Sequence, residues 1–273
     1  MNKIVLFAFL LVVLSSCNNE FSKVLKSKDY EYKYKMAEKY YANKNYNHAQ
    51  VLFEDVAPYE KGTTQYEDLY YKLAYSYYYQ KDYINAENLF KTFTETFPSS
   101  NRSEECEYMR AYSYYKQSPK VELDQTNTTK ALSLLQAFIN THPTSDKLKE
   151  ANALMDQCRE KLELKEFKSA ELYYNLGYYR AAAICFSSLS EDFPDSKNGD
   201  QYKLLVIKSY YKYAEQSFEE KQQERYEKVL SECSDFKERF AGSKYTPEVE
   251  KYKNDTNNFL KTIKNNEQAK KTF

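Results

Sequence analysis

The chain has 273 residues, enough for a sizeable hydrophobic core, and its 40 Lys and Arg balance its 40 Asp and Glu. A net charge near zero gives no overall attraction to nucleic acid or to an anionic surface, so we expect no nucleic-acid partner. With only 4 Gly and 6 Pro against 30 Tyr, the composition favours a mostly helical protein in which tyrosine does much of the packing.

The N-terminus has the pattern of an export signal. Lys3 precedes an apolar run, Ile4 to Leu14, which is too short to span a bilayer and suits the core of a signal peptide. The following Ser15-Ser16-Cys17 completes a segment that resembles a bacterial lipobox. We therefore expect a signal peptide over residues 1–16, lipidation at Cys17 as the membrane anchor, and a polar tether over 17–28. The alternative is an ordinary cleavable signal with an incidental cysteine.

The stretch from Tyr70 to Pro98 contains two helical patterns separated by a short polar turn. Ala74 in the first helix and Ala86 in the second let the two backbones approach closely, while large aromatics such as Phe90 fill the space around them. Pro98 ends the second helix because proline disfavours helical angles at the residue before it. The pattern predicts a helix-turn-helix hairpin of the tetratricopeptide (TPR) type.

The hairpin is repeated along the chain. Ala37, Ala74 and Ala111 recur at intervals of 37 residues. The hairpins end in related segments: Phe97-Pro98-Ser99-Ser100, His142-Pro143-Thr144-Ser145, Phe193-Pro194-Asp195-Ser196 and Phe240-Ala241-Gly242-Ser243. We expect the last serine of each segment to be the N-cap of the next helix. The repeats predict an all-α TPR solenoid of about five hairpins plus a C-terminal helix, and an unrelated helical bundle is the alternative.

The chain order predicts three structured regions. Repeats one to three occupy residues 29–146; Pro58 and Gly62 break the chain after the first, and the third carries a lengthened surface loop over 118–129. That loop is either a binding element or a tolerated insertion.

Repeats four and five occupy residues 147–244. They begin with one long helix, 147–174, and the fifth contains an elongated turn around 218–224. A C-terminal helix and a basic, frayed tail follow over residues 245–273.

No arrangement of residues indicates catalysis. The sequence has no Gly-rich phosphate loop, no Ser/His/Asp arrangement and no paired histidines, so we expect no enzyme, no cofactor and no metal site. His48 has no second histidine or cysteine near it. Four cysteines after Cys17 lie on predicted helices as apolar filling, and whether any pair forms a disulfide stays open: Cys106, Cys158, Cys185 and Cys233.

The lipobox, the tether, the five hairpins and the Phe-Pro-x-Ser endings together resemble the BamD family of outer-membrane β-barrel assembly lipoproteins over nearly the whole chain. The missing prolines of repeats one and five and the tyrosine richness are departures from that family. The resemblance implies a lipid-anchored protein of the outer membrane that faces the periplasm. It implies a BamA-type β-barrel protein as partner through its POTRA domains, and other assembly lipoproteins beside it. It also implies capture of the C-terminal segments of unfolded outer-membrane proteins.

In TPR proteins similar to this one, a concave groove is lined by residues of each first helix that are not used in packing. By position these are Tyr34, Tyr41, Tyr71, Tyr75, Tyr78, Tyr108, Tyr112 and Tyr115. The hypothesis is that this groove binds extended, aromatic-rich peptides through ring contacts and hydroxyl hydrogen bonds. The alternative is that most of these tyrosines pack against the next repeat.

Two other functions stay open. One is a TPR lipoprotein scaffold for cell-wall synthesis or another envelope complex. The other is a glycan-capturing lipoprotein that stacks sugars on tyrosines, against which the absence of Trp argues.

Overall fold

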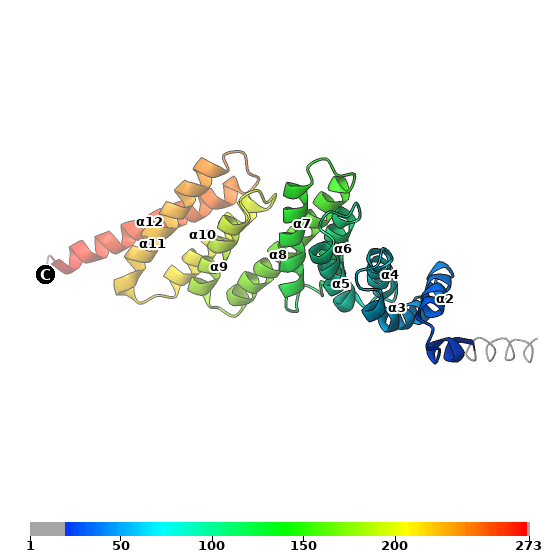
Figure 1. Cartoon of the computed structure of the whole chain (residues 1–273). Coiled ribbons are helices and arrows are strands. Elements are labelled where there is room, and N and C mark those ends of the chain that lie inside the picture. Colours follow the sequence, from blue (N-terminus) through cyan, green and yellow to red (C-terminus); the bar gives the residue numbers. More distant parts are fainter. Residues whose placement is uncertain (1–19, 272–273) are drawn as a thin grey trace, which may run out of the picture. The chain divides into compact units, whose positions relative to one another are not determined.

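The structure is a computed structural model that describes residues 20–271. Every regular element in that range is helical (Figure 1). After a helical turn over 20–25, the helices are α2 (Tyr30–Ala42), α3 (Tyr46–Glu60), α4 (Tyr66–Tyr79), α5 (Tyr83–Thr96), α6 (Ser103–Gln117), α7 (Thr126–Thr141), α8 (Leu148–Asn175), α9 (Tyr179–Asp192), α10 (Gly199–Glu215), α11 (Glu219–Arg239) and α12 (Thr246–Lys271). The five hairpins and the C-terminal helix confirm the predicted all-α TPR fold.

The chain forms two compact units that divide within α8, between Arg159 and Glu160. In the first unit, α2 to α7 pack each against the next in chain order, and the start of α8 joins their core. In the second unit, α9, α10 and α11 pack in the same successive manner, and α12 lies against both α10 and α11. None of the described helices is long and apolar enough to cross a bilayer.

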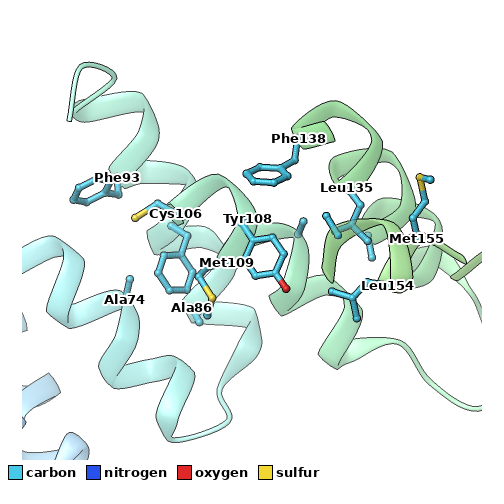
Figure 2. Close-up of a cluster of buried hydrophobic side chains, with 14 of the residues drawn as sticks. Ala74, Ala86, Phe93, Cys106, Tyr108, Met109, Leu135, Phe138, Leu154 and Met155 are labelled. Atoms are coloured by element: carbon cyan, nitrogen blue, oxygen red, sulfur yellow. The ribbon is translucent and has the colours of Figure 1, made fainter. Parts of the chain in front are cut away.

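A pair of small residues closes each of the first four hairpins, as the sequence predicts. The pairs are fully buried: Ala37 with Ala49, Ala74 with Ala86, Ala111 with Ala131, and Ala170 with Ala182. One turn further along the second helices, large side chains fill the space beside these contacts and are also buried: Phe53, Phe90, Leu135 and Phe186. In the first unit, Tyr108 and Met109 of α6 lie between Phe93 on one side and Leu135 and Phe138 on the other (Figure 2). One buried cluster therefore runs from the second hairpin through the third to the start of α8.

The tight turns between the helices of three hairpins share a residue with a positive φ. Lys44, Lys81 and Gly177 occupy the same repeat position, directly after the residue that caps the first helix, with φ of 59°, 65° and 81°. In the second hairpin the amide of Asp82 donates to the carbonyl of Tyr77 at 3.0 Å, which satisfies a carbonyl at the helix end. Two of the three hairpins thus place a lysine in a left-handed conformation that favours glycine.

The recurring serines have a different role from the predicted N-cap. Helix α6 begins at Ser103, and its cap residue is Arg102. The hydroxyl of Ser100 instead accepts a hydrogen bond from the Arg102 amide at 3.0 Å and donates to Glu67 Oε1 at 2.6 Å. Ser243 repeats the second contact with Asp200 Oδ2 at 2.7 Å. The serine therefore holds a turn that precedes the next helix and ties it to the first helix of its own hairpin.

Two connections and the C-terminal tail differ from what the sequence predicts. Helix α3 continues through Pro58 to Glu60, because a proline near the end of a helix removes only one hydrogen bond. The elongated turn expected around 218–224 is absent, since α11 begins at Glu219 with acidic residues that suit a helix N-terminus. Helix α12 extends to Lys271, into the tail that was expected to fray.

The insertion of the third repeat is a compact loop over 118–125, shorter than expected because α7 begins at Thr126. Gln125 is buried at its centre. Its amide donates to the carbonyls of Lys120 at 2.8 Å and Leu123 at 3.0 Å, and its Oε1 accepts from Thr128 at 2.7 Å. One glutamine side chain thus joins two carbonyls of the loop to the start of α7.

The segment expected to be a polar tether is in part docked on the first hairpin. Residues 20–25 are helical, and Val24 is fully buried in the core of α2 and α3. The ring of Phe21 stacks on His48 at 3.9 Å between centroids, so this histidine serves packing. Burial lowers the pKa of His48.

Candidate functional site: a tyrosine surface

The eight tyrosines proposed to line a groove all lie on α2, α4 and α6, in the first unit. Tyr34, Tyr75 and Tyr108 are buried, with 8%, 7% and 3% of their surface exposed. The remaining five are half-buried: Tyr41, Tyr71, Tyr78, Tyr112 and Tyr115. The side chains that a ligand can reach are therefore drawn mainly from this second set.

Glu105 on α6 engages two tyrosines of α4. Its Oε2 accepts a hydrogen bond from the hydroxyl of Tyr71 at 2.9 Å, and its Oε1 accepts one from Tyr75. The guanidinium of Arg102 lies over the Tyr71 ring, 4.5 Å from its centroid. These contacts join the second hairpin to the third, so both hydroxyls already have an intramolecular partner.

Asp68 on α4 organises a second polar cluster beside these rings. Its carboxylate contacts Lys72 at 2.6 Å and Arg102 at 2.8 Å, and the hydroxyl of Tyr34 lies at 3.5 Å. Lys72 also pairs with Glu38 of the first hairpin. Burial opposes ionisation of Asp68, but the hydrogen bonds from Lys72 and Arg102 outweigh it and lower its pKa.

Two of the proposed groove residues contact the start of α8. The hydroxyl of Tyr115 donates to Gln157 Oε1 at 2.6 Å. The ammonium of Lys147, the residue before α8, lies over the ring of Tyr108 at 5.7 Å from its centroid, and the hydroxyl of Tyr108 is buried. Burial and the neighbouring Glu150 raise the pKa of Tyr108. Both rings contribute to packing within the first unit.

The other rings form an unbroken line of contacts across three hairpins, which we call the tyrosine surface. Tyr46 stacks on Tyr79 at 4.4 Å between centroids, and Tyr79 meets Tyr78 at 5.5 Å. Tyr78 contacts Tyr112 at 6.1 Å. The members of the surface are Tyr41, Tyr46, Tyr78, Tyr79, Tyr83, Tyr112 and Tyr115.

Three members of this surface were missed in the sequence. Tyr79 is 47% exposed, the most accessible ring of the set. Tyr46 and Tyr83 are each the first residue of the second helix of a hairpin. Their spacing of 37 residues matches the repeat, but the groove positions of similar TPR proteins lie only on the first helix of each hairpin. The surface therefore spans both helices of the first two hairpins.

The tyrosine surface is uncharged at physiological pH. Burial and the nearby Tyr112 and Tyr83 hydroxyls raise the pKa of Tyr78 to about 12. Burial and the neighbouring Tyr46 raise the pKa of Tyr79 as well. One cation borders the surface, since the ammonium of Lys116 lies over Tyr83 at 5.9 Å and over Tyr112 at 5.8 Å. Such a surface offers ring faces and neutral hydrogen-bonding hydroxyls to a ligand.

Cys17 and the predicted signal peptide lie outside the residues that the structure describes. The other four cysteines lie within them. Cys106, Cys185 and Cys233 are free thiols, and all of the four described cysteines except Cys185 are buried, Cys158 included. Burial raises the pKa of Cys233 to about 11. A buried, protonated thiol of this kind behaves as a small apolar residue.

Repeated helical hairpins, each with a small-residue contact and aromatic filling, define the chain as a TPR protein. The chain belongs to the YfiO family of outer membrane lipoproteins, whose model matches residues 26–225. This match confirms the resemblance to lipoproteins of the BamD type. No curated protein matches the chain.

Two solved TPR structures are similar to most of the chain. The TPR2AB-domain:pHSP90 complex of yeast Sti1 is 11% identical, with a TM-score of 0.40 over 84% of this chain and 98% of that one. A thermophilic TPR protein of Thermus thermophilus is 15% identical, with a TM-score of 0.32 over 83% of this chain and 98% of that one.

Proposed function

We propose that this protein is a lipid-anchored scaffold of the outer-membrane β-barrel assembly machine, acylated at Cys17 and facing the periplasm. It holds a BamA-type β-barrel protein through that protein's POTRA domains. Its first unit receives the C-terminal segments of unfolded outer-membrane proteins. Family membership supports the location, and the tyrosine surface is the observation that carries the capture of polypeptide.

The tyrosine surface suits an extended, aromatic-rich segment. Its rings run in contact from the first hairpin to the third, so a strand-like peptide meets several ring faces in succession. The hydroxyls of Tyr46 and Tyr79 make no hydrogen bond to any described part of the chain. They are free to bond the backbone of a bound peptide.

The surface also suits peptides of many different sequences. Ring stacking and hydroxyl contacts depend little on the identity of the peptide side chains beyond their aromatic character. The raised pKa of Tyr78 keeps its hydroxyl protonated, so binding should not depend on pH over the neutral range. A scaffold that receives different barrel proteins needs this combination.

A peptide titration tests the capture step. The probe is a labelled ten-residue peptide with alternating aromatic residues and a C-terminal phenylalanine. The variant Tyr79→Ala/Tyr112→Ala should bind it about tenfold more weakly, since a few aromatic anchors dominate such interfaces. Tyr32→Ala is the matched control, because Tyr32 is 43% exposed on the same unit and outside the line of rings. Equal affinity of a folded double variant and the wild type would refute the proposed site.

The partner is tested separately by affinity purification of the tagged, lipidated protein from detergent-solubilised envelope. The proposal predicts a BamA-type barrel protein in about stoichiometric amount. Recovery of cell-wall enzymes without any barrel protein would support the other scaffold function instead.

A further inference from the structure

A hollow of about 400 Å³ opens in the second unit, where α9, α10 and α11 line it. Helix α9 contributes Arg180 and Ile184, and α10 contributes Tyr210 and Tyr213. All its residues belong to the second unit, whereas the tyrosine surface lies in the first. The hollow is therefore a feature that the proposed peptide capture does not use.

Its lining is strongly basic. Four residues of α11 face the hollow at helical spacing, Lys221, Glu224, Arg225 and Lys228, so they form one stripe on the helix. With Arg180 from α9, the lining holds four cations and a single carboxylate. Such an excess of one charge within a concave site attracts a group of the opposite charge.

Within residues 20–271, the two arginines of the hollow have no carboxylate partner, unlike its lysines. Lys228 pairs with Glu232 at 2.6 Å, and Lys221 contacts Glu224 at 3.5 Å. In contrast, the Arg225 guanidinium lies 4.0 Å from the centroid of the Tyr213 ring and donates only to the hydroxyl of Ser217.

Arg180 is exposed and forms no ion pair with the described residues. A guanidinium can bind a carboxylate through two parallel hydrogen bonds. Both guanidiniums of the hollow can therefore still bind a carboxylate in this way.

The surroundings favour a discrete anionic group over an extended anionic surface. Glu220 and Glu227 are exposed on the neighbouring face of α11 and would repel a flat anionic membrane. Ile184 is 51% exposed at the hollow and offers an apolar contact beside the charges. We propose that the hollow binds a glutamate or aspartate side chain, with an adjacent apolar residue, in an acidic segment of a partner protein.

The probe for this site is a labelled ten-residue peptide of alternating Glu and Leu, titrated into the full chain at low salt. The matched peptide of alternating Gln and Leu has the same apolar content without the charge. The Glu/Leu peptide should bind at least about tenfold more tightly, and added salt should weaken it. Equal binding of the two peptides, or no binding of either, would overturn the proposal.

Variants locate the interaction. Arg180→Gln/Arg225→Gln should weaken Glu/Leu binding about tenfold or more, and Lys244→Gln/Lys251→Gln, which removes two charges of the same unit outside the hollow, should leave it unchanged. Arg180→Gln alone changes an exposed residue that has no ion pair with the described residues, so this variant should fold normally. Weaker binding of the Glu/Leu peptide by Arg180→Gln therefore reports on the site and not on folding. Unchanged affinity of both arginine variants, or binding of phosphatidylglycerol vesicles but not of the peptide, would contradict the site. The tyrosine variants should not affect this titration, so failure here and failure of peptide capture are separable.

Discussion

The hydroxyl of Tyr71 donates a hydrogen bond to Glu105 Oε2 at 2.9 Å, and this contact joins the second hairpin to the third. The same carboxylate accepts from the buried Tyr75. Replacing Glu105 with Ala removes the carboxylate that accepts from both tyrosine hydroxyls. We expect Glu105→Ala to lower the free energy of unfolding by about 1–3 kcal/mol in urea titrations.

The control for this change is Glu95→Ala. Glu95 is exposed and has only a 3.7 Å contact with Lys91 one helical turn away, so its loss should cost less than about 0.5 kcal/mol. Equal stability of the two variants would show that Glu105 does not hold the hairpins together.

The serine at the end of a repeat should stabilise its turn measurably. Ser100→Ala removes the bond to Glu67 and the acceptor for the Arg102 amide, so we expect a loss of about 1–2 kcal/mol in the free energy of unfolding. Ser99→Ala is the adjacent control, because Ser99 is exposed and has neither bond. A loss as large in Ser99→Ala would assign the effect to local backbone propensity.

The left-handed turns predict two substitutions of opposite sign. Lys81→Gly relieves a φ of 65° and should raise the free energy of unfolding by about 0.5–1 kcal/mol, the steric relief less the entropy of glycine. Gly177→Ala places a side chain at a φ of 81° and should destabilise the protein by about 1 kcal/mol, although open space surrounds that position. Thermal unfolding of both variants checks the signs, and a loss of stability in Lys81→Gly would contradict the assignment.

Stability should fall in alkaline solution. Burial raises the pKa of Tyr77 and Tyr78 to about 12, against 10.0 for the unperturbed side chain, and burial likewise raises that of Tyr226 in the second unit to about 12. A raised pKa favours the neutral folded form, so the stabilisation is complete below pH 10 and is lost as pH rises through about 12. Urea midpoints should stay level up to pH 10 and then decrease. A midpoint that stays level to pH 12 would show that the rings are not shielded.

The sequence predicted the fold well because its signal is periodic. Ala37, Ala74 and Ala111 recur at intervals of 37 residues, and small residues at such a spacing indicate repeated close helix contacts. The two lost prolines and the insertion before α7 did not obscure that period. Local propensity was enough to find the turns, since Lys44, Lys81 and Gly177 follow the same helix ends.

The candidate site was only partly predictable, because position in a repeat does not fix burial. Tyr71 and Tyr108 are equivalent by spacing, yet one is half-buried and the other is covered by the start of α8. The partner of Tyr75, Glu105, lies 30 residues away, and no local pattern indicates it. Likewise, Ser100, Ser196 and Ser243 donate to carboxylates on a preceding helix, whereas the local capping rule assigned them to the following helix.

Photo-crosslinking from position 79 tests the central claim, that unfolded barrel proteins are received on the tyrosine surface, most directly. A benzophenone amino acid replaces Tyr79 in the cell, and a matched strain carries it at Tyr32, which is similarly exposed outside the line of rings. The account predicts that newly exported β-barrel proteins are crosslinked from position 79 and not from position 32. Equal crosslinking from both positions, or none from position 79 while barrel proteins are being made, would contradict it.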